Sequence, residues 1–325
     1  MTVSTFAGGA GYLDGTGTAA LFSSPLGIVS DHNGNFYIAD TYNSRIRKMT
    51  SNAVVTTLSG SDIQGNKDGN IDTATFYYPR GIAMDSHGNL FITSINGSNI
   101  RKITPTGIVS TFAGDPNAPG YVDATGTAAR FTSPGAITID GNDNIFVTDG
   151  TTQGSIIRKI TSTGVVTTFA GSGLIGSADG NGTSASFNQP TGLVTDPNGN
   201  LFVSDYGNNN IRKITPAGDV TTFAGNGIQG TTDGPALSAS FYSPVGIARD
   251  ANGNFYVTES DDKIRIITSD EIVTSLAGDD QAPSSVDGVG KYAGFASPSG
   301  IAIGPDGVIY VLDSYYSFIR KMIVE

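Results

Sequence analysis

The sequence predicts an all-β fold, a six-bladed β-propeller with four antiparallel strands in each blade. The first observation behind this prediction is a segment of about 55 residues that recurs six times, a period typical of radially repeated folds. Its most regular part is a Phe-x-x-Pro step, found at Phe22–Pro25, Phe76–Pro79, Phe131–Pro134, Phe187–Pro190, Phe241–Pro244 and Phe295–Pro298. The second observation is an Ile-Arg pair that closes every copy, with the arginine at Arg47, Arg101, Arg158, Arg212, Arg265 and Arg320. Repeated units made of strands bury their faces against their neighbours and close into a ring.

Within one copy, turn residues separate four short strands, which we call a, b, c and d in chain order. In the fourth copy we expect strands at residues 191–196, 200–204, 210–215 and 220–224. The segment Pro197–Gly199 is a hairpin turn between a and b, because Asn-Gly is the strongest short hairpin signal. Pro216–Gly218 turns the chain again between c and d. A loop rich in Gly and Asp, Gly225–Ser243, then leads to the next copy.

The two ends of the chain predict how the ring closes. The last copy stops after its third strand, and Thr2–Ala7 resembles the fourth strand of the other copies. We therefore expect residues 1–7 to form the outer strand of the last blade, so that residues 1–325 are one domain. Joining the ends in this way leaves no open sheet edge.

Composition limits the partners and the location. There are 29 Asp and Glu against 18 Lys and Arg, and an acidic balance argues against a nucleic-acid partner. No apolar run is long enough to cross a membrane, and no signal peptide is expected in this chain. A composition rich in Thr, Ser, Asn and Gly is common in bacterial surface and secreted proteins, so we expect an extracellular or cell-surface monomer.

The repeat resembles a known family. The pattern Asn35-Phe-Tyr-Ile-Ala-Asp40, followed by Asn43 and Ile46-Arg47-Lys48, is similar to the NHL repeat, and all six copies share it. The Asp-Gly connections between copies look like those of bacterial extracellular NHL proteins. The resemblance implies a six-bladed propeller, and it implies no single function. The family includes protein- and RNA-recognition modules, carbohydrate-associated surface proteins and a minority of enzymes.

The long b-to-c and d-to-a loops emerge on one face, which is the candidate functional surface. Ten of the 13 tyrosines fall in these loops. Tyrosine suits stacking on sugars or peptides, although these rings could instead fasten the loops to the blades. The candidate ligand-binding residues are Tyr77, Tyr78, Tyr242 and Arg80, expected near the channel mouth, and Tyr42, Tyr206, Tyr315 and Tyr316, expected as an outer ring.

Arg80 is the one charged residue at the start of any strand a. The six residues that begin these strands are Leu26, Arg80, Gly135, Thr191, Val245 and Ser299. A guanidinium near the channel could clamp a carboxylate or stack on a ligand; the alternative is a salt bridge to a nearby Asp. Acidic residues concentrate in the long loops, so this face should be acidic.

No catalytic residue is predicted. The two histidines, His32 and His87, fall in a-to-b turns on the opposite face, and there is no Cys. No cofactor is required; Ca²⁺ bound by acidic loops such as Asp261-Asp262 or Asp279-Asp280 stays open, and the metal site is unknown. We expect the Asp-Gly pairs to serve turn geometry and the closing arginines to bridge blades.

The sequence favours a non-catalytic binding or scaffold module that recognises a carbohydrate or an extended peptide on the long-loop face. One alternative is a hydrolase or lyase that depends on a divalent cation at the channel mouth. Another is a purely structural domain of a larger surface protein.

Overall fold

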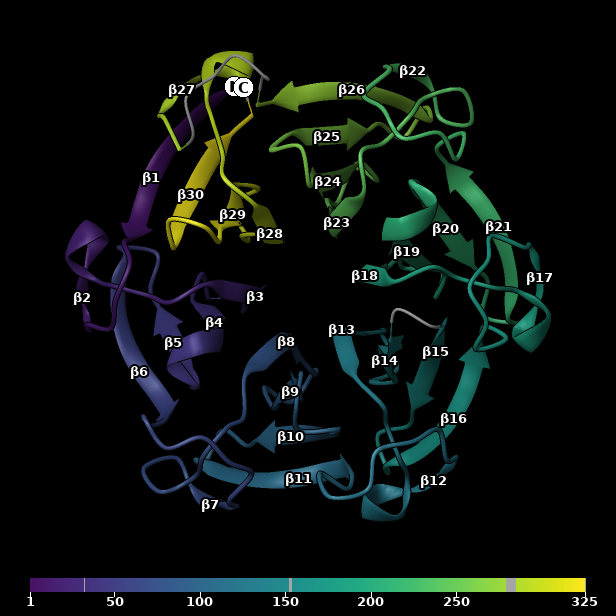
Figure 1. Cartoon of the computed structure of the whole chain (residues 1–325). Coiled ribbons are helices and arrows are strands. Elements are labelled where there is room, and N and C mark those ends of the chain that lie inside the picture. Colours follow the sequence, from purple (N-terminus) through teal and green to yellow (C-terminus); the bar gives the residue numbers. More distant parts are fainter. Residues whose placement is uncertain (32, 152–153, 279–284, 325) are drawn as a thin grey trace.

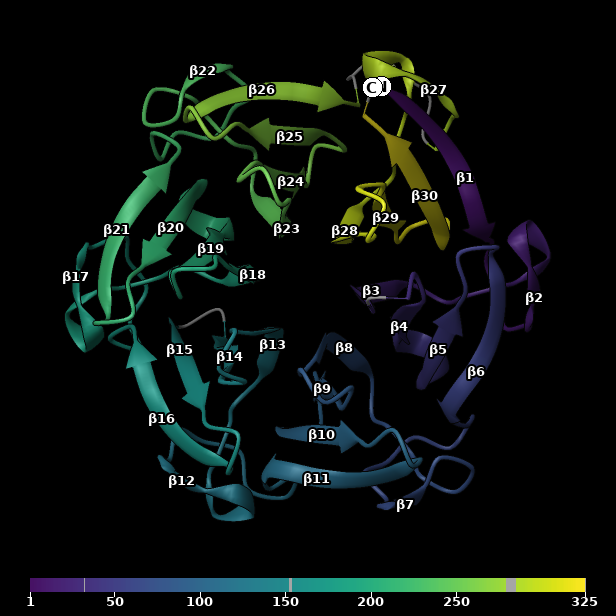
Figure 2. The same ribbon diagram turned by 180° about the vertical axis from the view of Figure 1, so that it is seen from behind.

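Six β-sheets stand around a central axis in the computed structural model of the chain (Figure 1). The structure describes residues 1–31, 33–151, 154–278 and 285–324. Each sheet is one blade, and Figure 2 shows the same ring from behind. The predicted all-β, six-bladed propeller is confirmed, but each blade has five strands.

In every blade the strands follow one another outward from the axis in the same order. Blade 1 contains β3 (Pro25–Ser30), β4 (Phe36–Asp40), β5 (Arg45–Met49), β6 (Val54–Gly60) and β2 (Gly15–Thr16). Blade 2 contains β8 (Pro79–Met84), β9 (Leu90–Ser94), β10 (Asn99–Ile103), β11 (Ile108–Gly114) and β7 (Gly69–Asn70). Blade 3 contains β13 (Pro134–Ile139), β14 (Ile145–Thr151), β15 (Gly154–Ile160), β16 (Val165–Ala170) and β12 (Ala124–Thr125).

The other three blades repeat this order. Blade 4 contains β18 (Pro190–Thr195), β19 (Leu201–Asp205), β20 (Asn210–Ile214), β21 (Asp219–Ala224) and β17 (Gly180–Asn181). Blade 5 contains β23 (Pro244–Arg249), β24 (Phe255–Glu259), β25 (Ile264–Ile267), β26 (Ile272–Ala277) and β22 (Gly234–Pro235). Blade 6 contains β28 (Pro298–Ile303), β29 (Ile309–Asp313), β30 (Phe318–Ile323), β1 (Thr2–Gly8) and β27 (Gly288–Val289).

Short 3₁₀ turns occupy two kinds of position. Four follow an outermost strand: η1 (Gly17–Ala19), η3 (Gly126–Ala128), η4 (Gly182–Ser184) and η6 (Gly290–Tyr292). Two lie in b-to-c loops: η2 (Thr41–Asn43) and η5 (Tyr206–Asn208).

The outermost strand corrects the expectation of four strands per blade. It consists of two residues from the long connection that arrives from the preceding blade; Gly15 and Thr16, for example, pair with Val55 and Val54 of β6. Residues such as Gly and Asn have low strand propensity, so the sequence carries no strand signal here. The pairing forms because the connection runs antiparallel along the exposed edge of the fourth strand and covers it.

The N-terminal segment lies inside blade 6 and not at its edge. β1 pairs with β30 on one side, from Thr2 opposite Ile323 to Gly8 opposite Phe318. On its other side it pairs with β27, where Thr2 lies opposite Val289. β1 is therefore the fourth strand of the last blade, and β27 takes the outer position that the sequence assigned to residues 1–7.

The hydrophobic core consists of six clusters, one between each pair of neighbouring blades. The cluster between blades 1 and 2, for example, joins Ala39 and Ile46 to Ile82 and Ile92. The phenylalanine of every Phe-x-x-Pro step is 0 to 2% exposed. Burial of one such ring stabilises the fold by about 1.5–3 kcal/mol, so the most regular residue of the repeat is a core residue.

The closing arginine of each copy is buried beside that phenylalanine and holds the outer part of the blade together. In blade 1, Arg47 Nη2 donates to Asp14 Oδ1 at 2.7 Å, and Nη1 donates to Asp40 Oδ2 at 2.8 Å. Asp14 also accepts the Thr57 N–H of β6. The Asp of each Asp-Gly pair is therefore an arginine partner and does not serve turn geometry alone. These arginines tie strand c to the connection that wraps the same blade, and do not join two blades as the sequence suggested.

The a-to-b hairpins are held by their own aspartates, as the turn pattern predicts. Asp196 Oδ1 accepts the N–H groups of Asn198 and Asn200 at 2.9 and 2.8 Å. Equivalent bonds form at Asp31, Asp85 and Asp140. One end of the ring therefore carries short, locally bonded turns, and the other carries the long loops.

Candidate ligand-binding face

The long loops are tied to the segment that leads into each strand a, which fixes the surface around the channel. The Tyr42 N–H of the b-to-c loop donates to the Ser23 carbonyl at 3.1 Å, and the Ile95 N–H donates to the Tyr78 carbonyl at 3.2 Å. Each blade therefore presents its b-to-c loop beside the residues that precede its Pro. Side chains from these two segments are the ones that can meet on this face.

Three of the candidate tyrosines form one aromatic cluster at the junction of blades 1 and 2. The Tyr77 and Tyr78 rings are stacked with centroids 5.4 Å apart, and Tyr42 meets Tyr78 edge to face at 5.8 Å. Tyr42 is 63% exposed, whereas Tyr77 and Tyr78 are half-buried. The cluster presents an exposed ring that is supported from below by two others, which is a geometry suited to stacking.

Tyr78 has a backbone conformation that bulky residues rarely adopt. Its φ is +49°, and at the same step four of the other five blades have a residue with a similar positive value: Ser24, Gln189, Ser243 and Ser297. A left-handed conformation at a bulky residue costs about 1–3 kcal/mol and persists only where the surroundings enforce it. Such strain is concentrated at functional sites, which makes Tyr78 a candidate of special interest.

The remaining candidate tyrosines are spread around the ring. Tyr315 and Tyr316 form an edge-to-face pair at 4.9 Å on blade 6 and are 71% and 40% exposed. Tyr242 precedes β23, which faces β8 across the ring (Figure 1), and Tyr206 is half-buried in η5. Among the described residues, no ring contact joins Tyr242 or Tyr206 to another tyrosine. The structure thus groups Tyr42 with Tyr77 and Tyr78, and leaves Tyr242 apart from them.

Arg80 reaches from β8 over the start of β13. A Cβ built on Gly135 would lie 3.2 Å from Arg80 Nη1 and 3.7 Å from Cζ, so the guanidinium occupies the space that a side chain at position 135 would take. It borders a pocket of about 240 Å³ whose other walls include Ser133, Thr148 and Thr191. The sequence analysis did not identify Gly135 as a site residue. The signal that could have done so is that Gly135 is the one residue without a side chain among the six that begin strand a.

Among the described residues, the Arg80 guanidinium has no hydrogen-bond or ion-pair partner, so the salt bridge considered from the sequence is not seen there. Burial lowers the pKa of Arg80, and no neighbouring acid offsets this effect. The donors of a half-buried guanidinium are costly to leave unpaired. Arg80 is therefore prepared to bind an acceptor oxygen.

Deeper in the channel the lining is apolar. A space of about 100 Å³ is surrounded mainly by glycines and aliphatic side chains such as Ile28, Ile137 and Ile301, with Arg80 at its edge. No group of three or more His, Asp or Glu residues converges anywhere in the described part of the chain. Asp261 pairs with Lys263 at 2.7 Å, and Asp262 accepts the Ser297 N–H, while His32 and Asp279-Asp280 lie outside the described residues.

The acidic character expected for this face is largely paired. Eleven carboxylates bind the six closing arginines: Asp14, Asp40, Asp68, Asp123, Asp149, Asp179, Asp205, Asp233, Glu259, Asp287 and Asp313. Five of these acids lie at or near the end of strand b and are fully buried. In blade 2 the equivalent residue is Ser94, so Arg101 lacks this second partner.

Burial changes the titration of the acids beneath the loops. It raises the pKa of Asp149 to about 6, although the Ser133 N–H and Arg158 donate to the carboxylate. It raises the pKa of Glu259 to about 7, with the nearby charge of Asp261 adding to the effect. Both groups support the loops from inside, and Asp149 also borders the pocket beside Arg80.

Comparison with known proteins supports the repeat assignment. A family model described as the NHL repeat matches residues 22–49 and 187–214, which lie in the first and fourth copies. Protein SUPPRESSOR OF QUENCHING 1, chloroplastic, of Arabidopsis thaliana is 37% identical over 91 residues, 28% of this chain and 9% of that protein. Human Teneurin-4 is 27% identical over 351 residues, 92% of this chain and 12% of that protein. The chain thus matches about a tenth of the length of these curated relatives. In the described part of the chain, no helix is long and apolar enough to span a membrane.

Solved structures share the whole architecture. A Bacteroides thetaiotaomicron protein of unknown function superimposes with a TM-score of 0.75 at 21% identity, covering 100% of this chain and 76% of that one. An auxiliary nutrient binding protein of Bacteroides ovatus gives 0.72 at 16% identity with the same coverages. A streptogramin B lyase gives 0.59 at 18% identity, covering 99% and 97%. At such identities the likeness is one of fold. The chain is a six-bladed β-propeller, and the NHL-repeat model matches two of its six copies.

Proposed function

We propose that this propeller is a non-catalytic binding module, with its ligand site on the long-loop face beside blades 1 to 3. The observation that carries the proposal is the unpaired Arg80 guanidinium over Gly135, at the edge of a 240 Å³ pocket. The Tyr77 and Tyr78 rings, which directly precede β8, and the Tyr42 ring, which meets them from the b-to-c loop of blade 1, would supply the apolar contact.

The chemistry of these groups favours a carbohydrate or an extended peptide. Arg80 can donate to a hydroxyl, carbonyl or carboxylate oxygen, and the exposed Tyr42 ring can stack on a sugar ring or a peptide side chain. Ser133, Thr148 and Thr191 offer further hydroxyl and backbone groups along the pocket. The auxiliary nutrient binding proteins of similar fold agree with a binding role by analogy alone.

The other proposals are secondary. No observation among the described residues favours a cation-dependent enzyme over a binding module, and bound Ca²⁺ is not needed for this chemistry. A purely structural domain is the result to accept if no ligand is found. We place the module, as a monomer, at the cell surface on composition alone; light scattering after size-exclusion chromatography and fractionation of the source cells test these two points.

The test begins with glycan and peptide arrays on the purified chain, followed by calorimetry on the best ligand. Arg80→Ala, Tyr78→Ala and Gly135→Ala should each weaken binding at least about tenfold. Gly135→Ala acts because its Cβ would press on the Thr148 hydroxyl and on the Arg80 guanidinium, which both border the pocket. Tyr292→Ala is the matched control, since this ring is 72% exposed on η6 at the outer rim. Equal effects of the control and Arg80→Ala, or no ligand on either array, would refute the proposal.

A further inference from the structure

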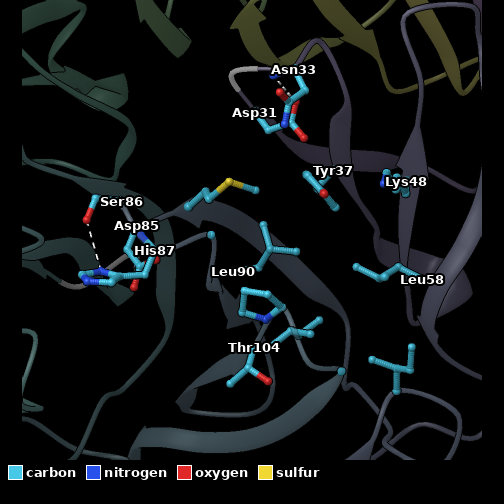
Figure 3. Close-up of a pocket in the computed structure, with 16 residues that line it drawn as sticks. Asp31, Asn33, Tyr37, Lys48, Leu58, Asp85, Ser86, His87, Leu90 and Thr104 are labelled. Atoms are coloured by element: carbon cyan, nitrogen blue, oxygen red, sulfur yellow. Dashed lines mark hydrogen bonds between the residues drawn. The ribbon is translucent and has the colours of Figure 1, made fainter.

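A second pocket opens at the opposite end of the ring, among the tight turns (Figure 3). It has a volume of about 560 Å³ and lies between blades 1 and 2. Its rim includes the a-to-b turns at Asp31 and Asp85 and the c-to-d turn at Pro105. A volume of this size is within the range of about 300–1,000 Å³ that small-molecule sites occupy.

The pocket lies at the first of the two repeats, the first and the fifth, that lack a ring present in the other four. In four blades a phenylalanine on the fourth strand packs against an aromatic ring on the second: Phe112 on Phe91 at 5.0 Å, Phe169 on Phe146 at 5.2 Å, Phe223 on Phe202 at 4.9 Å and Phe6 on Tyr310 at 5.2 Å. In blade 1 the two positions hold Leu58 and Tyr37. The smaller Leu58 leaves the face of Tyr37 and the neighbouring apolar side chains uncovered.

Apolar groups line the interior of the pocket. Leu58, Ile71, Met84 and Leu90 border it, and Figure 3 shows Tyr37 and Leu58 on one side with Leu90 facing them. Leu58, Ile71 and Met84 are only partly buried, because they pack on the core beneath and leave their outer surfaces to the pocket. A ligand that covered them would remove this apolar surface from water.

Two hydrogen-bond donors at the pocket have no partner in the described part of the chain. They are the Tyr37 hydroxyl and the Lys48 ammonium, which lies 5.9 Å from the Tyr37 ring centroid. In blade 5 the equivalent Tyr256 hydroxyl donates to Asp250 at 3.2 Å. Tyr37 makes no such bond, and burial, aided by the charge of Asp31, raises its pKa and keeps it a neutral donor.

The acids at the rim select against an anion. The carboxylate oxygens of Asp31 and Asp85 accept N–H groups of their own turns. His87 bonds to Ser86 and lies 3.4 Å from Asp143, turned away from the pocket interior (Figure 3). The interior therefore offers an apolar surface and two donors, beneath two carboxylates.

We propose that this pocket binds a neutral small molecule with a flat aromatic or branched aliphatic body and one or two acceptor oxygens. The body lies on Leu58, Met84 and Leu90, and the oxygens accept hydrogen bonds from Tyr37 and Lys48. This site is separate from the proposed carbohydrate or peptide site and does not depend on it.

The probe is prodan, a neutral naphthalene ketone whose fluorescence shifts to the blue in an apolar site. We expect saturable binding of one prodan per chain. Leu58→Phe restores the ring that four other blades have and should weaken binding at least about tenfold. Leu276→Phe makes the same change at the equivalent position of blade 5, away from the pocket, and should leave binding unchanged. Absence of saturable binding, or equal binding by wild type and folded Leu58→Phe, would overturn the proposal.

A second pair of variants decides the matter if Leu58→Phe does not fold. Tyr37→Phe combined with Lys48→Met removes both donors without filling the space, and should weaken prodan binding several-fold, within about one decade. Lys213→Met is the control, since Lys213 holds the same position in blade 4. If the double variant and the control bind prodan equally, the two donors do not contact the ligand and the proposal is wrong.

Discussion

At the scale of single residues, a buried arginine with two kinds of partner is the unit that the repeat preserves. Five of the six arginines join a half-exposed loop acid to a fully buried acid, and the sixth, Arg101, has only the loop acid Asp68. Removal of one member of a buried pair leaves a charge without a counter-charge. Arg101 can therefore be compared with the other five arginines to measure the effect of the buried acid.

Arg158→Ala should lower the free energy of unfolding by about 3–5 kcal/mol at pH 8, because Asp149 is left buried and charged. At pH 5 the loss should be smaller, since Asp149, with its pKa of about 6, is then protonated. Urea unfolding at both pH values measures this difference. Arg101→Ala is the matched control and should show a smaller loss with little dependence on pH. Identical losses in the two variants would mean that the buried acid is not the cause.

The raised pKa of Glu259 predicts how the unfolding free energy of the intact protein depends on pH. Its pKa is raised from 4.5 to about 7, so the folded state holds its proton more tightly than the unfolded state does. Its contribution to stability is complete below pH 4.5 and is lost as the pH rises towards 7. Glu259→Gln should therefore flatten the fall in unfolding free energy between pH 4.5 and 7. Asp72→Asn, at an exposed loop acid, serves as the control; a fall as steep in Glu259→Gln as in this control would assign the effect elsewhere.

At the scale of elements, the segment before each strand a has the same backbone in most blades but carries different side chains. Its backbone is the same in five blades, with a left-handed residue directly before the proline, but only blade 2 places a tyrosine there. The left-handed residue before the proline is thus a serine or a glutamine in four blades, and in blade 2 it is a tyrosine that belongs to an aromatic cluster.

Tyr78→Ser should separate stability from binding. Serine has the same left-handed conformation at this step in three other blades, so the melting temperature should stay within about 2 °C of wild type, equivalent to about 1 kcal/mol. Ligand affinity on the long-loop face should fall at least about tenfold, because the stacked ring is lost. Calorimetric titration and thermal unfolding of the same samples measure both. A large drop in melting temperature with unchanged affinity would assign Tyr78 a structural role.

The sequence predicts some elements well and others not at all. The six copies fix the four long strands and the hairpin turns, because apolar alternation and Asn-Gly signals are local. The fifth strand is not predictable from Gly69-Asn70 or Gly15-Thr16, since its pairing depends on a distant edge. The contact of Arg80 with Gly135 is likewise not predictable, because the two residues belong to different repeats. Leu58 is visible in the sequence, but only the packing of Phe112 on Phe91 in the next blade shows that its size opens a pocket.

At the scale of the whole molecule, the ring is closed by one strand from the far end of the sequence. β1 supplies backbone pairing to both β30 and β27, and Val3 and Ala7 are buried in the two clusters that flank blade 6. Without β1, blade 6 would lose the strand that joins the last copy of the repeat to the first.

Deletion of residues 1–6 should therefore lower the melting temperature strongly or cause aggregation, because two strand edges are exposed. Thermal unfolding with light scattering measures both effects. A synthetic peptide with the sequence Thr2–Gly8, added in excess, should restore part of the lost stability, and a scrambled peptide should not. An unchanged melting temperature after the deletion would show that the ring is held by other contacts.

The pairing of Thr2 with Ile323 brings the two ends of the described chain to one point on the outer rim of blade 6 (Figures 1 and 2). A ring whose ends meet can be reopened elsewhere: linking the present ends and cutting a tight turn in another blade would give a permuted chain with the same set of strand pairs. It can also be carried by a host polypeptide that enters and leaves at a single place, with both loop faces free of the linkers. The same geometry makes the propeller a module that engineers can insert into a surface loop of another protein.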